Sequence, residues 1–349
     1  MLRPIAGAIA VTMLAALGGH AESPAYTVQS APARKVETTF KYEVRYPNLK
    51  ATEWEIVVAR PPDLPGQAVS RVTVTPAGAD GTEAGALKQP VVRVLIKPES
   101  DAERQRAKVA VTTEATTMSR RLVPLAAGKT APAVRPLGDD ERKVYLAPTP
   151  HVDFDGEAFQ RWLDANKLRL QKKESEVDFA RRVFLALKKA LVYKRPFGHD
   201  GKASSTVGAG SGDCGCLSAV FVAALRANGV PARELVGRLV KSDRPFEQTE
   251  YGIHARAEFY AARVGWVPAD PSFGLADKSP LNHFGNDAGD LLVFHLDGDL
   301  VYETRSFGKA TLYRLQGAGL WVSGGGNLEG PESKEDWRVR DLPLNPKKK

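Results

Sequence analysis

A cysteine at the start of a predicted helix is the residue of this sequence best suited to act as a nucleophile. Cys214 follows Gly212 and Asp213 and precedes an apolar run that continues to Asn228. In the first turn of a helix, a thiol meets backbone N–H groups that lack an acceptor and the positive end of the helix dipole. Both stabilise the thiolate. The alternative is a small buried cysteine that fills a gap in the core.

A thiolate nucleophile needs a base, and a histidine and a carboxylate follow at a suitable spacing. His254 lies forty residues after Cys214 at the start of a predicted strand, and Arg256 and Glu258 share its face. Sixteen residues further, Asp270 ends a second predicted strand. If these strands are adjacent and antiparallel, Asp270 can hold the imidazole tautomer and stabilise imidazolium. We therefore expect Cys214, His254 and Asp270 to form a catalytic triad, with a purely structural histidine as the alternative.

Three segments resemble the motifs of the transglutaminase-like superfamily. They contain Cys214, His254 and Asp270, and they read GDCGCLSAVFVAALRANGVPAR, HARAEFY and GWVPADPS. Counting back from Arg233, which ends the first motif, places the nucleophile at Cys214 and not at the second cysteine. The resemblance covers about residues 175–275 and implies a papain-like, transglutaminase-like core.

Three positions depart from the pattern that is usual in this superfamily. Cys216 stands where a polar residue is usual, and Ser272 stands where threonine is commoner. Arg256 occupies the position two residues after the histidine, which is commonly aromatic. We expect Arg256 to affect substrate preference more than mechanism.

The chemistry that the resemblance implies is acyl transfer through a thioester on Cys214, with His254 protonating the departing amine. The backbone N–H of Cys214 is our candidate for one oxyanion donor, and Tyr193 is our candidate for a second. Packing at the end of a helix is the alternative role for Tyr193. We favour hydrolysis by a peptidase or amidase, because many bacterial relatives are thought to be peptidase-like. A protein-crosslinking transglutaminase and a non-catalytic envelope binding module on the same fold are the alternatives.

The two cysteines of the chain, Cys214 and Cys216, are poorly placed for other roles. A disulfide across one intervening residue would close a strained ring with little gain in stability. A C-x-C half-site for a metal lacks a second cysteine pair, so we expect no metal and no cofactor. Two residues along a helix, Cys216 points about 200° away from Cys214. We interpret it as a buried structural cysteine, with a redox partner role as the minority hypothesis.

The first residues have the pattern of a secretory signal peptide. Arg3 precedes a largely apolar run from Ile5 to Leu17, and small residues lead to Ala21, so we expect a signal at residues 1–21. The run is shorter than the roughly 20 apolar residues that cross a bilayer, which favours cleavage over a membrane anchor. We expect an exported protein, periplasmic or secreted, without stable membrane insertion. We expect its partner to be a peptide or protein substrate, and a component of the cell envelope is one candidate.

Charge gives no sign of a nucleic-acid partner. The chain has a formal net charge of +8, but Lys and Arg are interleaved with Asp and Glu along most of the sequence. Interleaved charges do not form the basic patch that binds nucleic acid, so we expect no nucleic-acid partner.

Short alternating strands are predicted for the region before the catalytic core. After a leader at residues 22–35, apolar and polar residues alternate across residues 36–125, in runs separated by Pro, Gly and Asp. This spacing predicts an antiparallel β-sandwich, which we interpret as a binding or spacer module. The stretch at residues 60–76 also resembles the β domain that often precedes such cores in bacterial exported members. Residues 126–150 have the composition of a linker.

Helices and then strands are predicted within residues 151–320, the expected catalytic domain. Ser175 can cap a helix that continues to Tyr193 and repeats apolar residues every four positions. The helix that begins at Cys214 is followed by several strands, so the predicted fold class is α+β with an N-terminal antiparallel sandwich. Residues 321–349 are polar, and we expect a C-terminal tail there.

Overall fold

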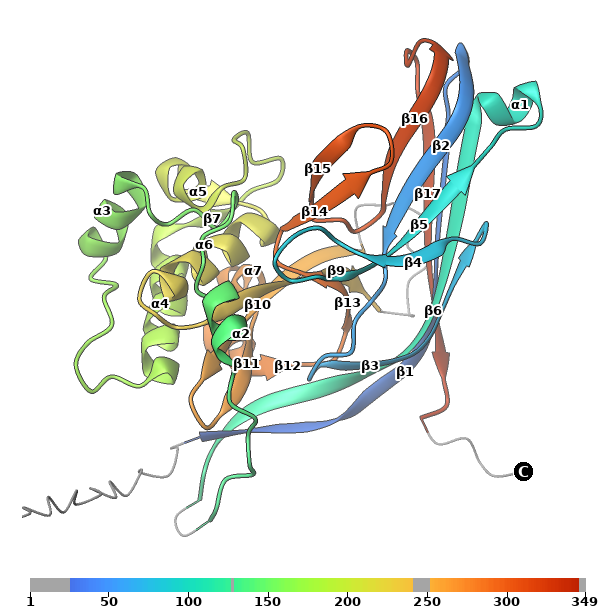
Figure 1. Cartoon of the computed structure of the whole chain (residues 1–349). Helices are drawn as coiled ribbons and strands as arrows, with labels where there is room; N and C mark the ends of the chain where they lie inside the picture. The colour runs from blue at the N-terminus through green and yellow to red at the C-terminus, as the bar shows by residue number, and fades with distance from the viewer. Residues whose placement is uncertain (1–25, 127–128, 241–251, 345–349) are drawn as a thin grey trace, which may run out of the picture.

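The computed structural model describes residues 26–126, 129–240 and 252–344 of the 349-residue chain (Figure 1). The predicted signal peptide, residues 1–21, lies outside these ranges and stays a prediction. Across the three ranges, no helix is both long enough and apolar enough to span a membrane.

Two antiparallel sheets form a sandwich on one side of the molecule (Figure 1). The first contains β1 (Tyr26–Arg45), β3 (Gln67–Thr75), β6 (Arg106–Pro124), β12 (Asn286–Asp287) and β17 (Glu332–Leu342). Its order is β12-β6-β1-β17, with β3 also paired to β6. The second contains β2 (Leu49–Ala59), β4 (Ala79–Thr82), β5 (Pro90–Ile96) and β16 (Ala318–Gly326), in the order β16-β2-β5-β4. A short helix, α1 (Asp101–Arg104), precedes β6.

Alternation of apolar residues explains why these sheets pack face to face. Val36 and Phe40 of β1 point into one cluster with Trp54 and Ile56 of β2, and all four are at most 3% exposed. Successive side chains of a strand point to opposite faces, so Glu37 and Thr39, which lie between such residues on β1, point to the other face and are half-buried. The antiparallel sandwich predicted from the period-two pattern is therefore confirmed.

The polar tail predicted for residues 321–349 is wrong, because two strands of the sandwich lie there. β16 pairs antiparallel with β2, and β17 pairs antiparallel with β1. β17 is an edge strand whose one fully buried side chain is Trp337, so it lacks a regular apolar alternation. The predicted leader, residues 22–35, differs in the same way: β1 begins at Tyr26 and already pairs with β6 there.

A third antiparallel sheet, covered by helices, forms the other half of the molecule (Figure 1). Its strands are β9 (Ala232–Leu239), β10 (Ile253–Ala261), β11 (Gly265–Ala269) and β13 (Leu291–Leu296), in the order β11-β10-β9-β13. The helices are α2 (Asp139–Val144), α3 (Glu157–Ala165), α4 (Glu176–Ala190), α5 (Ala203–Ala209), α6 (Cys214–Arg226), α7 (Pro271–Ala276) and the 3-10 helix η2 (Pro280–His283). One small parallel pair belongs to this half, β7 (Val192–Tyr193) with β8 (Ser211–Gly212). A small antiparallel pair, β14 (Asp299–Thr304) with β15 (Gly308–Tyr313), packs on the apolar cluster of the sandwich.

The helix that begins with Cys214 is buried along its whole length. Every residue of α6 is buried, as its apolar composition indicates. α4 presents Phe179, Val183 and Leu187 to the same core, each with 0% exposure. Ser175 caps α4 as expected, since its Oγ accepts a hydrogen bond of 3.1 Å from the N–H of Asp178.

The two halves share an apolar core and a hydrogen-bonded junction. Leu292 and Phe294 of β13 belong to the same apolar cluster as the inner face of the sandwich. The side chain of Gln67 on β3 donates to the carbonyl of Val293 and accepts from its N–H, both at 2.8 Å. The fold is α+β, as predicted, but the chain returns to the sandwich after building the helical half.

Candidate active site

The nucleophile candidate occupies the first helical position of α6. The Asp213 carboxylate accepts a hydrogen bond of 3.0 Å from the N–H of Cys216, and the Asp213 carbonyl accepts one of 3.0 Å from the N–H of Leu217. The N–H groups of Cys214 and Gly215 therefore have no acceptor within the helix. Cys214 is 8% exposed, so its thiol meets this polar helix end in a place with little water.

Strands β10 and β11 bring His254 and Asp270 together. The strands are antiparallel, with Ala257 opposite Ala269, so the end of β11 lies beside the start of β10. Nε2 of His254 is 2.7 Å from Oδ2 of Asp270. Cys214 interacts with the same ring, through its side chain and its charge. The three residues predicted as a triad are thus neighbours in the structure.

The charges in this cluster favour a protonated His254. Burial alone would lower the pKa of His254, but the carboxylate of Asp270 outweighs burial and raises the pKa to about 9, with a further contribution from Cys214. Burial would raise the pKa of Asp270, whereas His254 and Arg256 hold the pKa of this carboxyl well below its usual range. An imidazolium beside the sulfur stabilises a thiolate, which is the reactive form of cysteine.

Each carboxylate oxygen of Asp270 accepts two hydrogen bonds. Oδ2 faces the His254 ring and accepts from Nε of Arg256 at 2.9 Å. Oδ1 accepts from the Ser272 hydroxyl at 2.9 Å and from the N–H of Phe273 at 3.0 Å, which also caps α7. Four donors fix the carboxylate plane. Ser272 supplies the same hydroxyl donor that a threonine would supply.

Arg256 lies in a buried cluster of carboxylates, and its effect on substrate preference stays a prediction. It is 6% exposed, and its guanidinium forms ion pairs with three carboxylates. Besides Asp270, these are Asp287 at 3.0 Å and Asp290 at 2.6 Å. The alternation of β10 explains this placement, because Arg256 lies on the same strand face as His254.

The backbone of His254 is held by residues that the sequence did not single out. The side chain of Gln316 donates to the carbonyls of His254 at 2.8 Å and Gly237 at 2.6 Å. Gly237 lies opposite His254 in the β9–β10 pair. A Cβ at position 237 would lie 1.9 Å from the carbonyl oxygen of Leu292, so only glycine lets β13 approach β9 this closely.

Cys216 is a fully buried thiol. It is 0% exposed, and burial, followed by the nearby Asp213 carboxylate, raises the pKa of its thiol to about 12. A group of this kind stays protonated at neutral pH. Both cysteines are free thiols in the structure. Among the described residues, no group of three or more His, Cys, Asp or Glu side chains is arranged to hold a metal ion.

Tyr193, the candidate oxyanion donor, lies beside the nucleophile. α4 ends before it, and Tyr193 belongs to β7, where it is the parallel partner of Gly212. Burial, followed by the charges of Cys214 and Asp213, raises the pKa of its phenol, so the hydroxyl keeps its proton and can donate. The ring is 46% exposed, which leaves room for a substrate at this edge.

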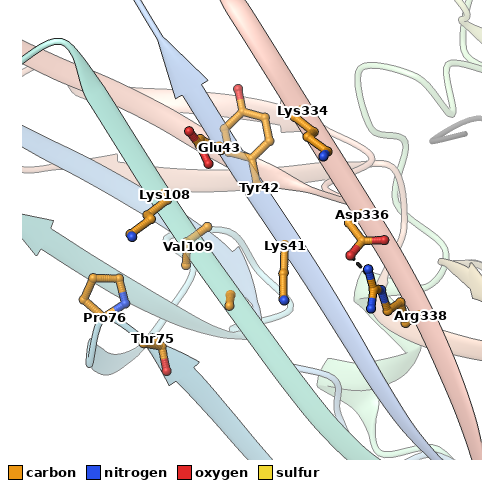
Figure 2. Close-up of a pocket in the computed structure, with 11 residues that line it drawn as sticks. Lys41, Tyr42, Glu43, Thr75, Pro76, Lys108, Val109, Lys334, Asp336 and Arg338 are labelled. Carbon is orange, nitrogen blue, oxygen red and sulfur yellow. Dashed lines mark ion pairs between the residues drawn. The ribbon is translucent and has the colours of Figure 1, made fainter. Parts of the chain in front are cut away.

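A hollow of about 380 Å³ lies away from the triad, on the outer face of the sandwich (Figure 2). Lys41, Lys108 and Lys334 project around it from β1, β6 and β17, and Asp336 pairs with Arg338 at its rim at 2.9 Å. None of the three triad residues lines it. The chemistry described above therefore belongs to the start of α6 and not to this hollow.

Comparison with known sequences agrees with this arrangement. Residues 165–271 match the sequence model of the Transglutaminase-like superfamily. The matched segment contains α4, α6, β10 and β11, and it ends directly after Asp270. An uncharacterized protein of Haemophilus influenzae is 32% identical over 156 residues, which is 36% of this chain and 38% of that protein. The alignment thus spans well under half the length of this relative.

Comparison with solved structures extends the likeness of fold to the sandwich. A protein of Cytophaga hutchinsonii that is proposed to be a cysteine protease superposes with a TM-score of 0.56 and 14% identity, over 91% of this chain and 94% of the other. The periplasmic domain of TgpA from Pseudomonas aeruginosa gives a TM-score of 0.35 and 14% identity, over 73% of this chain and 98% of that domain. The first likeness covers both halves, so the combination of the sandwich with the helix-covered sheet is a shared fold.

Proposed function

We propose that this protein is an exported cysteine enzyme that transfers acyl groups from peptide or amide bonds through a thioester. The observation that carries the proposal is the interaction of Cys214, at the start of α6, with a His254 ring that Asp270 holds through Nε2. The alternative of a non-catalytic binding module leaves unexplained why three chemically matched side chains from three elements meet in a buried cluster.

In the first step, the thiolate of Cys214 attacks the carbonyl carbon of the amide and forms a tetrahedral intermediate. The N–H of Cys214 and the hydroxyl of Tyr193 are the donors proposed to stabilise its oxyanion. The imidazolium of His254 then gives its proton to the departing amine, and the C–N bond breaks to leave a thioester on sulfur. Asp270 stabilises the imidazolium before this transfer and keeps the ring aligned afterwards.

In the second step, an acceptor attacks the thioester and returns the thiol. We favour water, which makes the enzyme a peptidase or amidase, because the proposed cysteine protease from Cytophaga hutchinsonii shares the fold over most of both chains. An amine acceptor would make it a protein-crosslinking transglutaminase. The proposed location outside the cytoplasm, from the signal pattern of residues 1–21, makes peptides and proteins of the cell envelope the substrates to test.

A peptide screen tests the proposal. Pools of envelope peptides are incubated with the wild type, Cys214→Ala and the matched control Cys216→Ala, and new peptide termini are identified by mass spectrometry. We expect products from the wild type and Cys216→Ala and none from Cys214→Ala. A fluorescent primary amine added to the same reactions distinguishes the acceptors, since its incorporation into product favours the transferase. Equal product from all three proteins would reject the proposal.

A further inference from the structure

A continuous chain of buried charges runs from the triad into the N-terminal sandwich. Asp270 contacts Arg256, Arg256 contacts Asp287 at 3.0 Å, and Asp287 contacts Arg120 of β6 at 3.4 Å. Arg120 then donates to Glu258 of β10 at 2.8 Å. The series of ion pairs from Arg256 through Asp287 and Arg120 to Glu258 therefore begins and ends on β10. Arg256 and Glu258 lie on the same face of that strand.

These charges are held where water does not screen them. Exposure is 2% for Arg120, 9% for Asp287, 6% for Arg256 and 1% for Glu258. A buried charge is tolerated when opposite charges and hydrogen bonds surround it, so each member depends on its neighbours for its position. Glu258 has a second cation, Arg233, whose Nε donates to it at 2.7 Å.

Strand β6 of the sandwich holds Asp287 through backbone pairing as well as through the Arg120 side chain. Strand β12 adds Asp287 to the edge of β6, directly opposite Arg120. Thr117, on the same strand, donates to the carbonyl of Gly289 at 2.6 Å. The segment that carries Asp287 is therefore attached to β6 at two points, and in this position the Asp287 carboxylate contacts Arg256.

We propose that Arg120 and Asp287 are positioning residues, through which the sandwich holds Arg256 and thereby aligns the Asp270 carboxylate with His254. This inference rests on the proposed function of the triad. It gives the sandwich a role other than that of a spacer or separate binding module. The helical half brings its own cysteine, histidine and aspartate, but Arg256, the cation beside Asp270, is held in part by Asp287, which pairs with strand β6.

The rate at which iodoacetamide alkylates Cys214, measured against pH in the full chain, tests this role without a known substrate. The proteins are the wild type, Arg120→Gln, Arg120→Lys, Asp287→Asn and the control Arg121→Gln. Arg121 is the next residue of β6 and is exposed on the opposite face. Peptide mapping assigns the alkylation to Cys214, and thermal unfolding reports the fold.

We expect the rate at pH 6 to fall about 10-fold in Arg120→Gln and Asp287→Asn, the usual size of an effect from a residue that orients a catalytic group. The acid limb of the profile should move to higher pH, because a misaligned Asp270 supports the thiolate–imidazolium pair less well. Arg120→Lys should recover part of the rate, and Arg121→Gln should match the wild type. A merely structural role would lower the melting temperature without moving the acid limb.

Two kinds of result overturn the inference, and they are distinguishable from a failure of the proposed function. If the wild-type Cys214 reacts faster than glutathione but the folded Arg120 and Asp287 variants keep its profile, the positioning role is rejected and the triad stands. If none of these variants folds, the residues are structural and the inference is likewise rejected. If the wild-type Cys214 reacts no faster than glutathione, the proposed function fails and the inference fails with it.

Discussion

Nε2 of His254 lies 2.7 Å from Oδ2 of Asp270, and the two residues are 4% and 3% exposed. Asp270 occupies this nitrogen, and Cys214 also interacts with the His254 side chain. One histidine thus joins a thiol at a helix start to a carboxylate that four donors hold. The predictions below follow from this contact and from the elements that maintain it.

Asp270→Asn should weaken the nucleophile while keeping the shape of the site. The variant removes the charge that raises the pKa of His254 to about 9, so this pKa should fall. We expect Cys214 to be alkylated at least about 10-fold more slowly at pH 6, as for the loss of other groups that orient a catalytic histidine. Histidine NMR titration of the wild type and the variant measures the pKa. An unchanged His254 titration would show that Asp270 does not set the charge of the ring.

The stability that protonated His254 provides should disappear at alkaline pH. The pKa of His254 rises from 6.5 to about 9 on folding, so this contribution is fully present below pH 6.5 and is lost as the pH rises through 9. We expect the stability advantage of the wild type over His254→Gln to shrink between pH 6.5 and pH 9.5. Urea unfolding of both proteins across this range measures it. A constant difference would indicate that the ring is neutral in the folded protein.

Gly237→Ala should separate the strands on which His254 depends. A Cβ at this position meets the carbonyl oxygen of Leu292 at 1.9 Å, which is backbone and cannot rotate away. Overpacking of a buried site costs about 1–3 kcal/mol, and contact with backbone places this substitution at or above the upper end. Gly81→Ala in β4 is the control, since nothing lies within 4 Å of its added Cβ. Thermal unfolding that ranks the two substitutions equally would contradict the close approach of β13.

Trp337→Ala should destabilise the protein although this residue lies near the end of the chain. The ring is 4% exposed, and its Nε1 donates to the carbonyl of Leu239 in β9 at 3.1 Å. Truncating a buried tryptophan costs about 3–5 kcal/mol. Arg338→Ala, at the next and exposed position of β17, should change the free energy of unfolding by less than about 0.5 kcal/mol. Similar effects of both substitutions would contradict the packing of residues 332–342 as a strand of the sandwich.

The sequence predicted that Cys214, His254 and Asp270 lie close together because the signals for this arrangement are local. A cysteine at a helix start, a histidine opening one strand and an aspartate closing the next each leave a mark within a few residues. Antiparallel pairing of β10 and β11 then follows from the short connection between them. Whether these residues catalyse a reaction stays a proposal that the experiments above test.

The sequence did not reveal the contacts that cross from one half of the molecule to the other. Arg120 lies in a period-two strand and looks like any other polar residue of a sheet, yet it ends buried between Asp287 and Glu258. β17 has so few apolar side chains that its pairing with β1, almost 300 residues earlier, leaves no local pattern. Such contacts depend on tertiary packing and become visible only when the strands are assembled.

The most direct test of the central claim is the alkylation rate of Cys214 compared with that of Cys216 in the same wild-type molecule. At pH 6, with iodoacetamide and peptide mapping, we predict that Cys214 reacts faster than glutathione and that His254→Ala abolishes the excess. Cys216, with its pKa raised to about 12, should stay unmodified in the folded protein. A Cys214 that reacts no faster than glutathione, or that is unaffected by His254→Ala, would contradict the assignment of Cys214 as an activated nucleophile.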